Sequence, residues 1–362
     1  MLYYWLYPLR DFFYGFNVFR YITFRAAGAA VTAFLISILL APWIIRQLDR
    51  LKIGETIRRR HVPTLYPLHA NKEGTPTMGG ILIVTAIVIS TLLWADVFNK
   101  YILLVLASII WLGIVGFIDD YIKLTSERSR GLRAITKLTG QTILGLLVGI
   151  YLLYGLGAKG IIEIPFLKNL LINLGYFYIF YVALVIIASS NAVNITDGLD
   201  GLAIGCVVMA ALAYSIMSYI AGNVNFSDYL MVFYVPGSGE LAIFCAAIAG
   251  AGLGFLWFNS YPASIFMGDT GALALGGAIG AVAILIKKEL LLVVVGGVFV
   301  IEALSVILQV ASVKIHGKRI FKMAPLHHHF QLNGWPESKI IIRFWIIAGI
   351  FAILSLATLK LR

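Results

Sequence analysis

The sequence predicts an all-α polytopic membrane protein, and two observations carry that prediction. Of the 362 residues, 60% are hydrophobic and only 12% are charged, whereas about a quarter of the residues of a soluble domain are charged. Apolar runs of about twenty residues recur, which is the length that a helix needs to cross a bilayer. This pattern excludes a soluble enzyme and a disordered chain, and the lack of strand-length alternation excludes a β-barrel.

The chain is expected to form one domain, residues 1–362, with ten membrane-spanning helices. Residues 1–21 are rich in aromatic side chains and are expected to lie in the membrane interface as an anchor. The ten spans are placed at 22–45, 79–96, 101–118, 138–157, 174–191, 203–221, 240–258, 271–286, 290–313 and 340–358.

Orientation follows from the basic residues. Loops at about 46–78, 119–137, 192–202, 259–270 and 314–339 lie on one side of the membrane. That side carries 17 of the 28 Lys and Arg residues, against 10 on the other. The positive-inside rule therefore predicts that these loops are cytoplasmic and that both termini are periplasmic. Cys206 and Cys245 lie in apolar runs and indicate neither a disulfide framework nor a zinc site.

Acidic residues are scarce, and five of the 17 fall at the predicted cytoplasmic ends of helices: Asp119, Asp120, Asp197, Asp200 and Asp269. The adjacent pair in GFIDDYIK, residues 116–123, would repel each other unless they share a cation or a proton. A solvated helix end is the alternative for that pair. Because three separate segments bring carboxylates to one membrane face, the predicted active site lies there.

Two further segments support a ligand site. In NAVNITDGLDG, residues 191–201, spacings of three place Asn194, Asp197 and Asp200 on one face of a helix, although a polar turn is the alternative. In NSYPASIFMGDTG, residues 259–271, Asp269 precedes an apolar helix, where an acid is often only a cap. Phe266 either faces lipid or stacks on a base.

The histidine triplet in APLHHHFQLNGWP suits a metal or, when protonated, a phosphate. Tandem histidines point in different directions, so His327, His328 and His329 cannot all serve one site on regular backbone, and a solvated loop is the alternative. Glu302 lies within a span, where a carboxylate is costly and a functional role is the default, but it suits a structural pair equally well.

Taken together, these residues indicate phosphoryl transfer onto a lipid. Carboxylate oxygens suit Mg²⁺, which keeps several waters and bridges phosphates. Lysines such as Lys72, Lys123 and Lys137 would neutralise a diphosphate. A transporter is the alternative from another class, but it would place its acids near the bilayer midplane, which among the acids considered fits only Glu302.

The motifs TPTMGG (75–80), GFIDDYIK, NAVNITDGLDG, GFLWFNSYPASIFMGDTG (254–271) and APLHHHFQLNGWPESKI (324–340) resemble the phospho-N-acetylmuramoyl-pentapeptide-transferase family. This family is part of the polyprenyl-phosphate N-acetylhexosamine-1-phosphate transferases. The resemblance runs from about residue 17 to the last residue. It implies ten spans with periplasmic termini in the bacterial cytoplasmic (inner) membrane, and a homodimer.

The resemblance also implies a Mg²⁺-dependent transfer of phospho-MurNAc-pentapeptide from UDP-MurNAc-pentapeptide to undecaprenyl phosphate, which gives UMP and lipid I for peptidoglycan synthesis. A related transferase of N-acetylglucosamine-1-phosphate is the alternative within this class, and no nucleic-acid partner is expected.

Carried over by position, the family's catalytic residues correspond to Asp119, Asp120, Asp269 and His328, with Asp269 also the magnesium ligand. The nucleoside pocket corresponds to Asn194, Asp197, Asp200, Asn259 and Phe266, whose ring stacks on uracil. Other residues that line the substrate path are Lys72, Thr77, Lys123, Lys137, His327 and His329.

Overall fold

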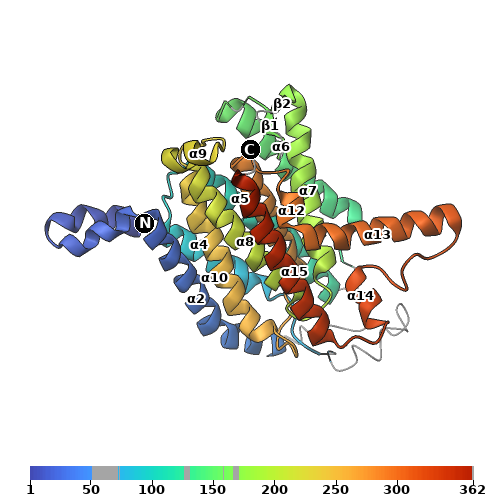
Figure 1. Ribbon diagram of the computed structural model, residues 1–362. Helices are drawn as coiled ribbons and strands as arrows, with labels where there is room; N and C mark the ends of the chain where they lie inside the picture. The colour runs from blue at the N-terminus through green and yellow to red at the C-terminus, as the bar shows by residue number, and fades with distance from the viewer. Residues whose placement is uncertain (51–71, 73, 126–130, 158, 166–170, 361–362) are drawn as a thin grey trace.

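The computed structural model describes residues 1–50, 72, 74–125, 131–157, 159–165 and 171–360, and it confirms the all-α class (Figure 1). Among these residues, nine helices are long and apolar enough to cross a membrane. A shorter apolar helix, α4 (Gly80–Trp94), occupies the predicted span at 79–96. Each of the ten predicted spans therefore corresponds to helical structure. Residues 51–71 and 73 of the predicted loop at 46–78 lie outside the described residues.

The long helices run back and forth through the bundle. They are α2 (Ile22–Arg50), α5 (Lys100–Thr125), α6 (Ala134–Ile150) continued by the π-turn η4 (Tyr151–Gly155), α7 (Tyr178–Thr196), α8 (Leu202–Ala221), α10 (Leu241–Asn259), α11 (Gly268–Leu285) and α15 (Glu337–Ala357). We define the site end of the bundle as the end where α5, α7 and α10 finish and α8, α11 and α15 begin.

Short elements cap the bundle. At the end opposite the site, β1 (Ile161–Glu163) and β2 (Leu171–Asn173) pair antiparallel, with Ile162 opposite Ile172. The one-turn helix η5 (Gly175–Phe177) precedes α7, and α9 (Val224–Leu230) and η6 (Ser238–Glu240) connect α8 to α10. At the site end, α14 (Leu326–Gln331) precedes α15, and the turn η7 (Thr358–Lys360) follows α15 at the opposite end.

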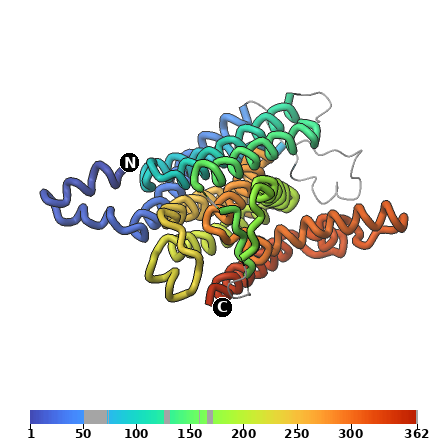
Figure 2. Tube along the Cα trace, turned by 90° about the horizontal axis from the view of Figure 1, so that it is seen from above, coloured from blue at the N-terminus to red at the C-terminus, as the bar shows by residue number. Residues whose placement is uncertain are grey.

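One predicted span is not continuous. The expected helix at 290–313 is divided at Gly296 and Gly297 into α12 (Leu292–Val295) and α13 (Gly297–His316). Both halves are apolar, so hydropathy alone predicts one span, whereas paired glycines destabilise a helix interior. Beyond the break, α13 extends sideways from the bundle in both views (Figures 1 and 2).

The centre of the bundle is built from α10 and α11, whose side chains are mostly buried. Small residues let the backbones approach closely, as is common between helices in membranes. A Cβ added at Gly250 of α10 would lie 2.0 Å from the carbonyl oxygen of Ala30 in α2, and one at Gly145 would lie 2.4 Å from the Cα of Ala183. These contacts fix how the helices that carry the site are spaced.

The N-terminal tract forms α1 (Leu2–Leu6), η1 (Tyr7–Asp11) and η2 (Tyr14–Arg20), which fold back on one another and extend to one side of the bundle (Figure 1). Its aromatic rings at Trp5, Phe12, Phe13 and Tyr14 are exposed. Its interfacial position and the side of the membrane on which the termini lie stay predictions.

Candidate active site

Three carboxylates from two helices meet at the site end. Asp119 and Asp120 lie near the end of α5, and Asp269 lies in the first turn of α11. One oxygen from each lies within 4.8 Å of the others. The helices approach this closely because residue 116 is glycine: a Cβ there would lie 2.4 Å from the carbonyl oxygen of Asp269.

Asp120 caps the helix that carries Asp269. Its Oδ1 accepts a hydrogen bond from the backbone N–H of Asp269 at 3.1 Å. Its Oδ2 accepts from the backbone N–H of Thr270 at 2.9 Å and from the Thr270 hydroxyl at 2.7 Å. A carboxylate is stabilised at this position by the free N–H groups and the dipole of the helix. The cap of α11 therefore comes from another helix, and the side chain of Asp269 makes other contacts.

Two lysines lie between the carboxylates. The Nζ atom of Lys123 is 2.6 Å from Oδ2 of Asp119 and 3.1 Å from Oδ2 of Asp269. The Nζ atom of Lys137, from α6, is 2.9 Å from Oδ2 of Asp119 and also forms an ion pair with Oδ2 of Asp269. Two ammonium groups thus partly neutralise three carboxylates, which leaves a net negative charge that favours a cation.

The loop after α7 is joined to this cluster by Asn194. The Nδ2 atom of Asn194 donates a hydrogen bond to Oδ1 of Asp269 at 2.9 Å. Asp197 follows directly at the C-terminal end of α7, and its backbone N–H donates to the carbonyl of Asn194. The helix ends at this point, so Asn194 faces the carboxylate cluster while the following residues form the loop 197–201.

A second ion cluster fixes the other end of that loop. The Nζ atom of Lys72 is 2.6 Å from Oδ1 of Asp200 and 2.5 Å from Oε1 of Glu337. Oδ2 of Asp200 accepts a hydrogen bond from the backbone N–H of Ala263 at 3.0 Å. Sequence reasoning did not single out Glu337, whose only signal was an acid in the first turn of the last helix.

The segment 259–267 packs against the loop and against residues 76–80. The side-chain amide of buried Asn259 accepts a hydrogen bond from the backbone N–H of Gly201 and donates one to the carbonyl of Ile265. Asn259 therefore links the backbone of the loop 197–201 to that of its own segment. Phe266 is half-buried; its backbone N–H donates to the carbonyl of Pro76, and its carbonyl accepts from the backbone N–H of Gly79. Half-buried Thr77 lies between those two residues in the sequence, and its hydroxyl forms no hydrogen bond to another described residue.

The three histidines have different surroundings, as tandem residues on a helix must. His327 is buried and contacts Glu302. His328 is half-buried, with its Nδ1 atom 2.9 Å from Oε1 of Gln331. His329 accepts a hydrogen bond through Nδ1 from the backbone N–H of Lys322. The structure therefore brings only His327 into the buried part of the site end.

The carboxylate cluster fits a divalent cation. Its donors are oxygens only, which is the ligand type that Mg²⁺ prefers. The Oδ2 atoms of Asp119 and Asp269 already attract two ammonium groups, so positive charge is stabilised at this point. Asp119, Asp120 and Asp269 would hold such an ion.

The fold and the cluster define a class: a multi-pass membrane protein with carboxylates and lysines at one end of its bundle. The glycosyl transferase family 4 model matches residues 102–287, and a phospho-N-acetylmuramoyl-pentapeptide-transferase signature matches residues 72–84. The class is therefore that of membrane-embedded transferases.

Relatives over the full chain specify the family. Proteins named phospho-N-acetylmuramoyl-pentapeptide-transferase are 54% identical in Desulfatibacillum aliphaticivorans and 52% identical in Syntrophus aciditrophicus and Citrifermentans bemidjiense. Each match covers 100% of both chains. The chain belongs to the phospho-N-acetylmuramoyl-pentapeptide-transferase family, whose bacterial members are inner-membrane proteins.

Proposed function

We propose that this protein transfers phospho-MurNAc-pentapeptide from UDP-MurNAc-pentapeptide to undecaprenyl phosphate, with release of UMP and formation of lipid I for peptidoglycan synthesis. Family membership over the full chain supports this reaction. The observation that carries it is the cluster of Asp119, Asp120 and Asp269 with Lys123 and Lys137 at one end of a membrane bundle. The proposal includes a homodimer, which rests on the family alone.

In the proposed reaction, an oxygen of the acceptor phosphate attacks the sugar-linked phosphorus, and the bond to UMP breaks. Both substrates carry negative charge, so Lys123 and Lys137 orient and neutralise them. Bound Mg²⁺ would supply further charge stabilisation at the diphosphate. The three aspartates would hold this ion.

The hydrogen bonds distinguish the two adjacent aspartates. Both oxygens of Asp120 accept hydrogen bonds from the first turn of α11. In Asp119, Oδ1 accepts from the backbone N–H of Leu132, while Oδ2 pairs with Lys123 and Lys137 next to the carboxylate of Asp269. We therefore assign to Asp119 the removal of a proton from the acceptor phosphate. A single attack of this kind inverts the configuration at the transferred phosphorus.

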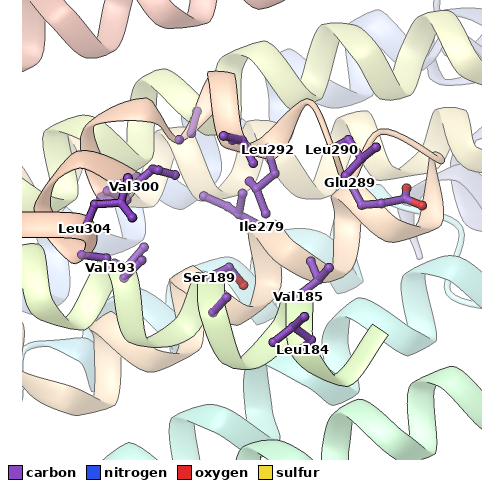
Figure 3. Close-up of a pocket in the computed structure, with 18 of the residues that line it drawn as sticks. Leu184, Val185, Ser189, Val193, Ile279, Glu289, Leu290, Leu292, Val300 and Leu304 are labelled. Atoms are coloured by element: carbon purple, nitrogen blue, oxygen red, sulfur yellow. The ribbon is translucent and has the colours of Figure 1, made fainter. Parts of the chain in front are cut away.

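An apolar cavity of about 340 Å³ suits the polyprenyl chain of the acceptor (Figure 3). Side chains of α7, α11, α12 and α13 line it, among them Leu184, Ile279 and Leu292. Val193 also lines the cavity, and the next residue, Asn194, bonds Asp269. A lipid in the cavity would therefore reach the carboxylate cluster along α7.

The test is label transfer by purified protein in detergent, with UDP-MurNAc-pentapeptide or UDP-N-acetylglucosamine as donor and undecaprenyl phosphate as acceptor. We expect transfer from the first donor only, loss of transfer with a chelator and recovery with Mg²⁺. Transfer from the N-acetylglucosamine donor would assign the chain to that reaction instead. Absence of transfer from both donors would contradict the proposed reaction, and retention of configuration at phosphorus would contradict a single attack.

A further inference from the structure

A carboxylate inside α13 contacts both the backbone and the ring of one histidine of the triplet. Oε1 of Glu302 accepts a hydrogen bond from the backbone N–H of His327 at 3.2 Å. Oε2 of Glu302 lies 3.3 Å from the ring atom Nδ1 of His327. Both side chains are at most 1% exposed. The reaction proposed above assigns no role to this pair.

The contact with Glu302 favours one tautomer of the ring. The Nδ1 and Oε2 atoms lie at electrostatic contact distance but form no hydrogen bond of normal geometry. A carboxylate is only an acceptor, so its charge favours a proton on Nδ1. The other nitrogen, Nε2, also has no hydrogen-bond partner among the described residues. A buried polar atom without a partner costs free energy, and such atoms in native structures usually meet a ligand or a water.

The Nε2 atom of His327 lies against the loop 197–201. A Cβ added at Gly198 would be 2.3 Å from Nε2, so residue 198 leaves the ring in direct contact with backbone. On either side of this glycine, Asp197 follows the helix that carries Asn194, and Asp200 pairs with Lys72. A ring held at this position contacts the loop that joins the two ion clusters of the site.

We propose that Glu302 is a positioning residue for the transfer reaction. It holds His327 with Nδ1 protonated and directs the unprotonated Nε2 to the site loop, where a hydroxyl group of the bound nucleotide donates a hydrogen bond to Nε2. The inference rests on the proposed function, because it requires that substrate. It also explains why α13 carries a carboxylate within an apolar segment, where such a group is otherwise unfavourable.

The test is Glu302→Gln, which keeps the shape and the acceptor for the backbone N–H of His327. The amide then donates to Nδ1, so the proton of the neutral ring moves to Nε2. In the Ser-His-Asp triad, replacement of the aspartate by asparagine lowers kcat about 10⁴-fold through this wrong tautomer. We expect kcat to fall by about 10²-fold or more, with KM for the UDP donor changed less than about threefold.

A double-mutant cycle separates positioning from a structural role. In a His327→Asn background, Glu302→Gln is expected to lower kcat no further, because the ring on which it acts is gone. Equal loss in both backgrounds would overturn the inference, and so would normal kcat in Glu302→Gln alone. The parent protein, measured in the same assay, tests the proposed function separately: if it transfers normally, either result contradicts the inference alone.

Glu240→Gln is the matched control for loss of a paired, half-buried carboxylate. Glu240 pairs with Arg25 at 2.6 Å and lies at the opposite end of α10 from Asn259. This variant is expected to lower thermal stability without a change in kcat per folded protein. If Glu302→Gln loses stability as Glu240→Gln does while its kcat per folded protein stays normal, Glu302 is structural and the inference is wrong.

Discussion

Asp120 at the end of α5 accepts two hydrogen bonds from Thr270, one from the backbone N–H and one from the hydroxyl, at the start of α11. The adjacent residue, Asp119, makes no hydrogen bond to the backbone of α11; it accepts one from the backbone N–H of Leu132 and pairs with two lysines. Two neighbouring carboxylates therefore have different tasks, because a helix places successive side chains about 100° apart. Asp120 fixes the helix that carries Asp269, and Asp119, buried between two lysines, is the residue that we propose to act on the substrate.

The capping role of Asp120 predicts a difference between two variants. Asp120→Ala removes the cap and is expected to cost about 1–2 kcal/mol of stability, whereas Asp120→Asn retains most of it because the two residues cap about equally well. Thermal unfolding in detergent measures both changes. Equal destabilisation by both variants would show that charge, not the cap, is the stabilising contribution.

Asp269→Asn tests the metal site. The amide retains the size of the side chain but loses the charge that attracts a hard cation and the two lysines. We expect a folded protein whose transfer rate falls by orders of magnitude, with part of the rate recovered at high Mg²⁺. Asp49→Asn, an exposed acid at the end of α2, is the control. Near-normal transfer by Asp269→Asn would exclude this residue from the proposed metal site.

Lys72 is expected to serve both substrate binding and the local charge balance. Lys72→Met leaves Asp200 and Glu337 buried without their cation, which should lower the melting temperature and raise KM for the UDP donor. Adding Glu337→Gln removes one of the unpaired charges. The double variant should therefore regain stability, whereas its KM for the UDP donor should stay raised. Recovery of KM in the double variant would mean that Lys72 acts only as a structural counter-ion.

Phe266→Ala tests the nucleoside pocket. A ring that stacks on one base contributes about 1–3 kcal/mol, so affinity for UDP measured by calorimetry should fall by that amount. Phe98→Ala is the control, because Phe98 is exposed between α4 and α5 at the opposite end. Unchanged UDP affinity in Phe266→Ala would place the base elsewhere.

Glu289 gives the protein a pH-dependent stability. Burial raises the pKa of its carboxyl to about 7, and neither oxygen has a hydrogen-bond partner among the described residues. The folded state therefore holds this proton more tightly, so stability is greatest below the unfolded pKa and is lost as pH rises towards 7. The loss amounts to about 3 kcal/mol. Melting curves of the parent and Glu289→Gln between pH 4 and 8 should converge at low pH and separate as pH rises, whereas parallel curves would contradict this.

The sequence predicted the ten helices because hydropathy decides whether a segment enters a membrane. It did not predict the break before α13, since Gly296 and Gly297 lie within an apolar run. The carboxylate cluster was predicted as a convergence on one face, and the structure brings Asp119, Asp120 and Asp269 together. One of the two partners of Lys72 could not be predicted, because Glu337 lies 265 residues away and no local pattern links them.

The histidine triplet shows the same limit. The family resemblance indicates His328 as the catalytic histidine, whereas burial indicates His327 as the histidine inside the site. The roles of both residues stay predictions. Burial here depends on α13, whose sideways path brings Glu302 to the triplet. A hydropathy pattern records that α13 is apolar but not the direction in which it runs.

Close backbone contact sets the separation of the carboxylates. A Cβ at Gly80 would lie 2.0 Å from the backbone nitrogen of Gly271, and one at Gly116 would be nearly as close to Asp269. Backbone cannot rotate aside as a side chain does, so a single added methyl group at either glycine would force whole helices apart. Backbone atoms rather than side chains therefore set the distance between Asp119 or Asp120 on α5 and Asp269 on α11, and with it the spacing of the proposed metal ligands.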